Sequence, residues 1–569
     1  MRTTSATLHR AARGFQPRLE PLEARTLMAV DVILEWNDVL LAANANDHAL
    51  VSPEQGGPIL TARAFAIVSA AMYDAYNSVE NIGRPYLVAV PRADRADSDA
   101  AVAQAAHNTL EALYPAQEAL FDAALTQTLD RIRNGIPESL GRAVGAYVAH
   151  RILRVREDDG AADLANNTYV WNGELGFHKA DPLHPDQGYY ASSAMDVDPF
   201  AVRSLDHFEA RRLDDGTPAG RAEFLEGEEY TLAYDEALAL GGDGVTSPTE
   251  RTDEQTTIGI FWAYDGRPGL GTPPRLYNQI VRTVAVQEHN SEAENARLFA
   301  LVNIAMADAG LASWTNKYDD AFWRPIMGIR GGDDDGNLQT DGFADWTPLG
   351  SPASNPRPGE TNFTPPFPAY TSGHATFGAA AFQILTRFYG RDDISFTFVS
   401  DEFNGLTRGS DGEVRPVVSR TFDSFTEAKL ENAQSRIYLG IHWAFDRDDG
   451  VRQGNRAANY IFNNFFRPTH HHGDGHSNPD TSPLAIQPNP AGGDDDKRET
   501  NPAGSAELRD REPLTAAQQS HGAASQVPGQ FVDRVMSELG ASQEAGDAES
   551  DASAIVSDKL IATLGSSVR

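Results

Sequence analysis

The amino-acid sequence predicts an all-α protein made of two helical bundles that lie side by side, over residues 30–467. Small and apolar residues recur at three- and four-residue spacing over long stretches, which is typical of amphipathic helices. Alternation of apolar and polar residues, the pattern of strands, is scarce. The chain has 569 residues, 41% of them hydrophobic, which is enough for one large helical core or for two.

The first helical half is expected over residues 30–216. Its helical patterns lie at residues 61–79, 100–113, 117–134 and 138–156. An irregular stretch follows, from residue 158 to about residue 215, and is rich in Asp, Pro, Gly and Asn. This composition is typical of loops, so we expect the stretch to join two helical halves.

The second helical half is expected over residues 217–467. Its helical patterns lie at residues 274–287, 291–313, 369–389, 424–439 and 449–466. After Pro468 the composition changes abruptly, which predicts an acidic and mostly disordered tail over residues 468–569 with one or two weak helices. The tail opens with the cluster His470–His472, which could bind a divalent metal but which we interpret as an adventitious binder.

The charge balance excludes several kinds of partner. The chain has 47 Lys plus Arg and 81 Asp plus Glu, for a formal net charge of −34. A surface this acidic repels nucleic acid and anionic membranes, and the chain has no apolar run of about 18 residues that would span a bilayer. We therefore expect no nucleic-acid partner and no transmembrane segment. An acidic protein that binds an anion must gather its cations locally.

Cysteine is absent from the chain, which excludes disulfides and thiolate metal sites. Because thiols oxidise readily, this composition also suits a protein that works with a strong oxidant. Residues 1–29 form a basic leader without the apolar core of a standard signal peptide. Within it, residues 18–25 resemble a short N-terminal segment of many exported planctomycete proteins, which implies export to the periplasm or the outside of the cell.

Three short segments carry the residue types that hold an oxyanion. They are Lys317 with Arg324-Pro325, then Ser372-Gly373-His374, then Arg436 with His442. Together they supply three cations, a hydroxyl, a glycine amide and two imidazoles. Guanidinium groups bind anionic oxygens bidentately, ammonium adds a point charge, and glycine lets a backbone N–H approach an anion closely. The set fits a tetrahedral oxyanion or its trigonal-bipyramidal analogue.

The spacing of the first segment predicts its geometry. Lys317 and Arg324 are seven residues apart, which is two helical turns, so both can reach one side of an anion. We expect Pro325 to break this helix directly after Arg324.

The spacing of the third segment predicts a turn. Arg436 and His442 are six residues apart and would point to different sides of a continuous helix, but a break at Gly440 would let Arg436 end one helix and His442 open the next. His442 and Asp446 are four residues apart, so the carboxylate can accept a hydrogen bond from the imidazole N–H.

In order, the three segments read K-x6-R-P, S-G-H and S-R-x5-H, which resembles the signature shared by vanadium haloperoxidases and type 2 phosphatidic acid phosphatases. The resemblance to fungal vanadium chloroperoxidases extends over residues 258–447, a far more specific match than a short motif. It implies an oxyanion site at one end of the C-terminal bundle, occupied by vanadate.

The resemblance also implies a role for each matching residue. His442 would be the axial ligand to vanadium, and His374 would bind the apical oxygen and act as an acid–base group. The equatorial oxygens would be held by Lys317, Arg324, Arg436, Ser372 and the Gly373 amide. Asp265 would support Arg436, and Trp314 and Phe367 would line the halide pocket.

The function that the resemblance implies is oxidation of chloride, bromide or iodide by hydrogen peroxide. The hypohalous acid formed would react with an organic acceptor, and Lys317 would polarise the peroxide. Vanadate would act as a Lewis acid without changing its redox state. We favour chloride as a substrate because Phe367 resembles the chloroperoxidase residue, where bromoperoxidases tend to carry histidine.

Two other functions remain open at this point. An acid phosphatase of the same superfamily would use His442 as the nucleophile and His374 as the leaving-group acid. The membrane-bound phosphatases, however, have spanning helices, and no such segment is expected here. A non-catalytic, extracellular anion-binding protein is the second alternative, given the acidic tail, although the intact catalytic set argues against it.

Three features depart from the family pattern or carry no function in this interpretation. Thr371 replaces the usual proline before Ser-Gly-His, with a small expected effect because that proline is not a ligand. The long interval between His374 and Arg436 predicts an inserted loop around residues 401–416. The acidic run at residues 333–335 resembles a calcium loop only superficially, and we interpret it as a solvated turn.

Overall fold

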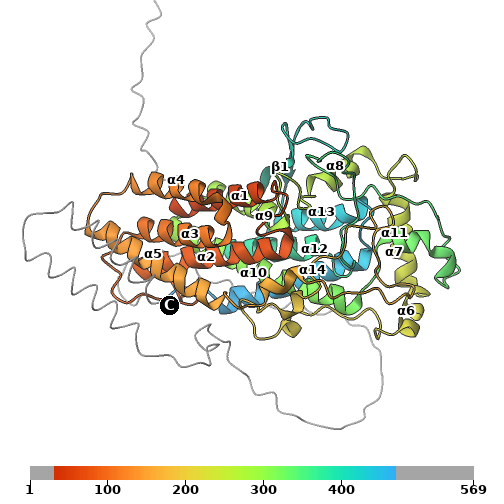
Figure 1. Ribbon diagram of the computed structural model, residues 1–569, viewed down its shortest axis with the longest axis horizontal. Helices are drawn as coiled ribbons and strands as arrows, with labels where there is room; N and C mark the ends of the chain where they lie inside the picture. Colours follow the sequence, from red (N-terminus) through yellow and green to blue (C-terminus); the bar gives the residue numbers. More distant parts are fainter. Residues whose placement is uncertain (1–30, 470–569) are drawn as a thin grey trace, which may run out of the picture.

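The computed structural model describes residues 31–469, and these residues are mostly helical (Figure 1). Within this range the only strands form one two-stranded sheet. The prediction of an all-α fold is confirmed. The predicted basic leader and the tail from His470 onward, with its histidine cluster, lie outside the described residues.

The N-terminal helices build one end of the molecule (Figure 1): α1 (Val32–Asp47), α2 (Gly57–Glu80), α3 (Ser98–Leu113), α4 (Glu118–Leu129) and α5 (Ile136–Val155). The side chains of Asp31 and Asp97 begin α1 and α3, since each accepts a hydrogen bond from a backbone N–H of the first turn. Gly145 lets α5 approach α3 closely, because a Cβ there would lie 2.2 Å from the carbonyl oxygen of Ala101.

Helices from the second half build the other end of the molecule (Figure 1): α6 (Pro218–Leu225), α7 (Glu228–Gly241), α8 (Asp253–Phe261), α11 (Pro325–Arg330), α12 (Gly373–Tyr389), α13 (Phe425–Tyr438) and α14 (Ala444–Asn464). α12 and α14 form the closest of these pairs. A Cβ at Gly454 of α14 would lie 2.2 Å from the carbonyl oxygen of Thr376 on α12. Nearer the start of α14, a Cβ at Gly450 would lie 2.9 Å from the carbonyl oxygen of Ser372, so this part of α14 lies against the N-terminal end of α12.

Two further helices, α9 (Pro273–Gln287) and α10 (Glu292–Asp320), connect the ends. α10 packs against α2 on one side and against α12 and α14 on the other, so one apolar core runs through both halves. Among residues 31–469, α10 alone has the length and composition of a membrane-spanning helix, and 94% of its apolar window is buried inside the fold. Its hydropathy is therefore that of a core helix. The division at residue 217 stays a prediction, since α10 contacts helices of both halves.

The irregular stretch at residues 158–215 contains only short 3-10 helices, namely η2 (Ala161–Ala165), η3 (Ala194–Asp196) and η4 (Leu205–His207). Asp308 of α10 anchors this stretch, because its buried carboxylate accepts the backbone N–H groups of Phe200 (2.6 Å) and Ala201 (2.8 Å). The expected irregular structure of this stretch is observed, whereas its place between two helical halves stays a prediction.

The sequence patterns missed some helices and misplaced several ends. α1, α6, α7, α8 and α11 were not predicted, and α10 runs on to Asp320 rather than ending at residue 313. Residues 369–372 are not helical, although a helix was predicted there. They form a buried segment with bends at Tyr370 and Thr371, after which Ser372 caps α12. Burial rather than helical periodicity explains why these residues are apolar or small.

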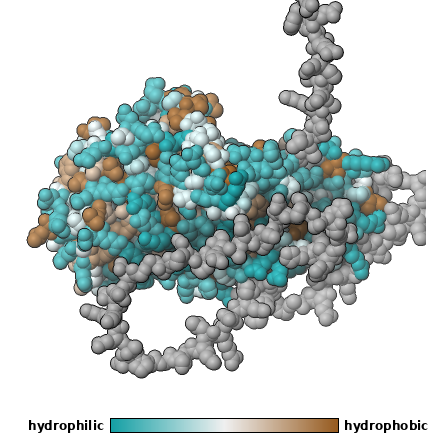
Figure 2. Space-filling view, turned by 180° about the vertical axis from the view of Figure 1, so that it is seen from behind, coloured by the Kyte–Doolittle hydropathy of each residue, from teal (hydrophilic) through white to brown (hydrophobic). Residues whose placement is uncertain are grey.

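The sheet is an antiparallel hairpin of β1 (Phe396–Asn404) and β2 (Val417–Phe422), in which Phe396 pairs with Phe422. The predicted inserted loop at residues 401–416 is the turn of this hairpin, but residues 401–404 belong to β1. Buried and exposed residues alternate along β1, as in a strand with one face on the core. Figure 2 shows that the molecular surface is mostly hydrophilic on one face, as the net charge leads one to expect.

Candidate oxyanion site

Lys317 and Arg324 come from two helices rather than one. α10 ends before Ala321, which has a left-handed backbone (φ +46°), and Arg324 caps α11. The prediction that one helix carries both cations and breaks at Pro325 is wrong, because Pro325 begins a helix. Proline suits the first helical position, where no N–H is needed. Both cations nevertheless lie over the ring of Phe367, 5.2 Å and 4.9 Å from its centre.

The ammonium group of Lys317 is buried and donates only to backbone carbonyls. It binds those of Pro368 (3.1 Å), Ala369 (3.0 Å) and Thr371, which ties the end of α10 to the segment before α12. Burial, and then the positive charge of Arg324, hold the pKa of Lys317 well below its ordinary value. A neighbouring anion would reverse this effect.

Ser372-Gly373-His374 forms the first turn of α12. Ser372 is the N-cap, and its hydroxyl accepts a hydrogen bond from Ala375 N–H (3.4 Å). Only glycine fits at position 373, because a Cβ would lie 2.9 Å from the ring of Trp314. The three residues therefore present a hydroxyl, a helix N-terminus and an imidazole at one place, an arrangement that favours anions.

One nitrogen of His374 is assigned by its partner. Nε2 lies 2.6 Å from the carbonyl oxygen of Ala263, and since a carbonyl only accepts, Nε2 carries the proton and Nδ1 keeps its lone pair. Burial, followed by the charge of Arg436, lowers the pKa of His374 to about 3. The imidazole is therefore neutral near pH 7 and can accept a proton through Nδ1.

Arg436 and His442 lie on either side of a turn at Gly440, as predicted. Gly440 has φ +68°, and a Cβ there would lie 2.4 Å from the carbonyl oxygen of Gly241. Arg436, in the last turn of α13, donates through Nη2 to both carboxylate oxygens of Asp265 (3.0 and 2.9 Å). Its Nε and Nη1 are buried and have no partner among the described residues.

His442 has an unprotonated Nε2, which lies beside the guanidinium group of Arg324. Its Nδ1 lies 2.9 Å from the carboxylate of Asp446, as expected from their spacing, and Arg324 Nη1 lies 2.9 Å from Nε2. Since guanidinium only donates, Nε2 accepts and Nδ1 carries the proton. Burial, then Arg324 and Lys317, hold the pKa of His442 well below its ordinary value. Nε2 is thus available as a ligand or a nucleophile.

The segments are joined by direct contacts. Arg324 reaches the turn before α14 through the Ile441 carbonyl (2.8 Å), and Ser372 N–H donates to the Asp446 carbonyl (3.0 Å). His374 Nε2 lies 3.8 Å from the carboxylate of Asp265. These contacts bring the predicted oxyanion-binding residues of α10, α12, α13 and the turn before α14 into one buried cluster.

The electrostatics of the cluster favour an oxyanion. Lys317, Arg324 and Arg436 are at most 1% exposed. Arg324 Nη2, like two nitrogens of Arg436, is a buried donor without a partner among residues 31–469. Burial lowers the pKa of Arg324 to about 9, with Asp446 as the main opposing influence. Buried donors of positive charge that lack acceptors fit an anion with several oxygens.

Aromatic residues border the cations. Trp314 and Phe367 are 4.9 Å apart between ring centres, and Tyr190 lies 6.3 and 6.2 Å from them. Sequence reasoning missed Tyr190, because it comes from the irregular stretch. It also missed His178, a buried residue whose ring nitrogens have no partner within the described chain and whose pKa is lowered by burial, then by Arg324 and Lys317.

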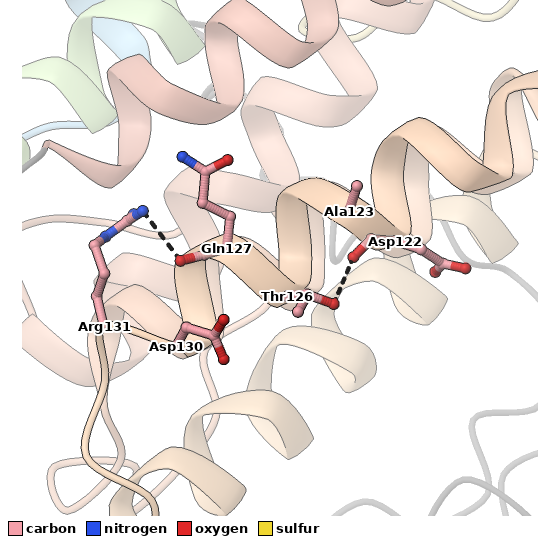
Figure 3. Close-up of a pocket in the computed structure, with 6 residues that line it drawn as sticks. All are labelled: Asp122, Ala123, Thr126, Gln127, Asp130 and Arg131. Carbon is pink, nitrogen blue, oxygen red and sulfur yellow. Dashed lines mark hydrogen bonds between the residues drawn. The ribbon is translucent and has the colours of Figure 1, made fainter.

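Two other candidate features carry no such chemistry. Figure 3 shows a hollow on the outside of α4, where Thr126 and Arg131 donate to backbone carbonyls of the same helix, so no groups converge on a common ligand. At residues 333–335, the acidic run forms the short helix η5 (Gly332–Asp334) and the residue after it. The Asp335 carboxylate there accepts bonds from Asn337 N–H (2.9 Å) and the Thr340 hydroxyl (2.9 and 2.8 Å).

Comparison with known proteins gives one family. A family model described as the VCPO second helical-bundle domain matches residues 297–470. The vanadium chloroperoxidase of Curvularia inaequalis is 35% identical over 505 residues, which cover 75% of this chain and 80% of that protein. Two bacterial structures share the fold. One, described as the first bacterial vanadium-dependent iodoperoxidase, covers 76% of this chain and 95% of its own (TM-score 0.58, 22% identity). The other, a holo-type vanadium-dependent chloroperoxidase, covers 75% and 97% (TM-score 0.53, 16% identity).

Proposed function

The chain belongs to the vanadium chloroperoxidase family, and from this premise we propose that it is a vanadate-dependent haloperoxidase that oxidises halide with hydrogen peroxide to hypohalous acid. The observation that carries the proposal is the set of unpartnered guanidinium nitrogens of Arg324 and Arg436, together with the unprotonated Nε2 of His442, which lies 2.9 Å from Arg324 Nη1. Vanadate has oxygens for these donors and a central atom for the imidazole, so the residues fit the cofactor. When bound, it supplies Lewis acidity that activates peroxide.

In this proposal the cations hold the anionic oxygens. Arg324 and Arg436 direct their unpartnered nitrogens to these oxygens, and Lys317 adds its ammonium charge. Ser372 and Gly373 contribute a hydroxyl and a backbone N–H. Because these groups are held by helix ends and backbone carbonyls, they need little rearrangement when negative charge develops on oxygen, which is preorganised electrostatic stabilisation.

The histidines divide the remaining work. His442 holds the central atom through Nε2, while Asp446 keeps the proton on Nδ1. His374 takes the proton of hydrogen peroxide at Nδ1, which is unprotonated because Nε2 donates to the Ala263 carbonyl. The negative charge of a bound oxyanion opposes the charge of Arg436 at His374 and so makes protonation easier.

Chloride is the halide that we propose, with bromide and iodide as easier substrates. The support is the aromatic lining by Trp314 and Phe367, and the resemblance of Phe367 to the chloroperoxidase residue. The cation at Lys317 lies 5.3 Å from the centre of the Trp314 ring and favours a halide at this border. Rates with the three halides at equal concentration, measured with one phenolic acceptor, test this point.

A slow phosphatase activity is the second function that we propose, and the unprotonated Nε2 of His442 favours it. Phosphate shares the tetrahedral shape of vanadate, so the vanadate-free protein should hydrolyse an activated aryl phosphate with His442 as nucleophile. Titration with orthovanadate should abolish this hydrolysis and produce peroxide-dependent bromination along one shared curve. Phosphatase turnover on the order of 10 per second, with no vanadate-dependent halogenation, would show that a phosphatase is the correct assignment.

Export remains a separate proposal. It rests on the resemblance of residues 18–25 to the N-terminal segments of exported proteins. Fractionation of cells that express the full chain tests it, with a variant lacking residues 1–29 as the control. Equal distribution of both between the fractions would contradict export through this segment.

A further inference from the structure

Two residues of the oxyanion site depend on one short stretch of backbone, residues 261–265, which we name the support segment. Its Ala263 carbonyl accepts the His374 Nε2 proton at 2.6 Å, and its Asp265 carboxylate binds Arg436. The stretch begins with the last residue of α8 and has no regular structure after it. The geometry of both site residues therefore depends on whatever fixes this segment.

The backbone of the support segment has an unfavourable conformation at Tyr264. Tyr264 has φ +46°, a left-handed conformation that an aromatic residue rarely adopts, and Gly266 follows with φ +72°. Such a conformation persists only where surrounding contacts determine it. Local backbone bonds flank Tyr264, from Ala263 N–H to the Ile260 carbonyl (3.1 Å) and from Gly266 N–H to the Gly271 carbonyl (2.9 Å), but the N–H of Tyr264 itself donates to a residue outside this stretch.

The first strand of the hairpin supplies contacts from outside the segment. The buried hydroxyl of Ser400 donates to the carbonyl of Phe261 (2.6 Å) at the start of the support segment. The carboxylate of Glu402 accepts the backbone N–H of Tyr264 (3.3 Å) next to its end. Between them, Asp401 N–H donates to the Tyr264 hydroxyl (2.7 Å). Three successive residues of β1 thus hold the segment.

Other buried contacts fix the side chain of Glu402. Its side chain is fully buried, and its second oxygen accepts the Ser354 hydroxyl (2.6 Å) and forms an ion pair with Arg415. β2 also contributes, because Arg420 binds Glu431 (2.8 and 2.6 Å), whose carboxylate accepts the indole N–H of Trp262 (2.9 Å). Both strands of the hairpin therefore hold the support segment.

We propose that Glu402 is a positioning residue for the oxyanion site, which fixes Arg436 through Asp265 and His374 through the Ala263 carbonyl. The proposal rests on the proposed function, since it concerns the same anion. It gives the hairpin at residues 396–422, which the site does not otherwise use, a defined part in the reaction. Glu402 touches neither the anion nor the reacting atoms.

Orthovanadate binding to the full-length apoprotein, measured by calorimetry, tests the proposal. Glu402→Gln should weaken binding about tenfold, and Asp265→Asn about 10–100-fold, as for other residues that orient ligands. Because Glu402 acts partly through Asp265, the losses of affinity in the double variant should be clearly less than additive. At saturating vanadate, the kcat of Glu402→Gln should fall while KM for peroxide stays constant, since His374 loses its fixed partner.

Thr397→Val is the matched control in the same strand. Its hydroxyl pairs with that of Thr421 (2.8 Å) on the exposed face of the hairpin, so vanadate affinity and kcat should not change. If Glu402→Gln does not fold, Ser354→Ala replaces it, with a smaller loss of affinity expected. Full vanadate affinity and kcat in a Glu402 or Ser354 variant with a lowered Tm would overturn the proposal, and so would additive losses in the double variant. A wild-type chain that binds no vanadate would instead overturn the proposed function itself.

Discussion

Replacing Arg436 with lysine should weaken oxyanion binding about 10–100-fold while the positive charge is kept. In the structure, Arg436 uses one nitrogen, Nη2, for Asp265 and leaves Nε and Nη1 buried without a described partner. A lysine has one ammonium group at the end of a flexible stem. It can approach Asp265 or the anion but cannot bridge the two in the same way.

The magnitude follows from the hydrogen bonds that are lost. The guanidinium of Arg436 offers two free nitrogens to the anion, and the ammonium of lysine replaces about one of them. A hydrogen bond to a charged group contributes about 1.5–3 kcal/mol. Since about 1.4 kcal/mol corresponds to a factor of ten, the dissociation constants for orthovanadate and orthophosphate should both rise about 10–100-fold.

Arg221 provides the matched control for this prediction. It is equally buried, but each of its nitrogens has a partner: Asp214, the carbonyl of Gly176 (2.7 Å) and that of Asp320 (2.6 Å). Arg221→Lys should therefore lower Tm and leave anion affinity unchanged. Arg436→Lys should instead weaken anion binding, with a smaller effect on Tm. Calorimetric titration and thermal melting of both apoproteins measure this. Unchanged vanadate affinity in Arg436→Lys would refute the reasoning, because the free nitrogens of Arg436 would then not face the anion.

Two further predictions concern other residues. His442→Ala should abolish vanadate binding, because it removes the ligand nitrogen, whereas His374→Ala should keep weaker binding but lose most turnover; equal loss of bound vanadium in both would contradict this division. Burial, and then the charge of Asp99, raise the pKa of Glu292 from 4.5 to about 7, so folding is penalised increasingly as pH rises through this interval. Glu292→Gln should thus stabilise the protein by about 1 kcal/mol near pH 8, after allowance for screening, and not at all near pH 4. Melting curves at both pH values check this, and an equal gain at both would count against it.

Much of the helical fold could be predicted because most core helices carry apolar residues at helical spacing. The failures have physical causes. Residues 315–320 are mostly polar, so the apolar pattern ends near residue 314, but α10 itself continues to Asp320. Residues 369–372 are buried without being helical, and the Lys317 ammonium group donates to the carbonyls of Ala369 and Thr371 there. Helix ends depend on such tertiary contacts, which periodicity does not contain.

The residue types of the candidate site could be predicted, but the helix ends and the neighbouring groups that position them could not. Lys317 and Arg324 were identified from their spacing, yet the helix between them ends at Ala321, since proline can begin a helix as well as end one. Tyr190 and the Ala263 carbonyl gave no signal. A backbone carbonyl has no residue type to recognise, and the irregular stretch has no period that would place Tyr190 beside Phe367.

Two buried cations of the site have lowered pKa values, which a bound anion would raise. Burial keeps the pKa of Lys317 well below its ordinary value and lowers that of Arg324 to about 9, so holding a positive charge costs both residues more here than in water. An oxyanion in this cluster supplies negative charge and raises both pKa values. Its binding therefore favours protonated Lys317 and, by mass action, stabilises the folded chain. Since α10, α11 and α13 supply the cations of the site, a bound anion would link these three helices.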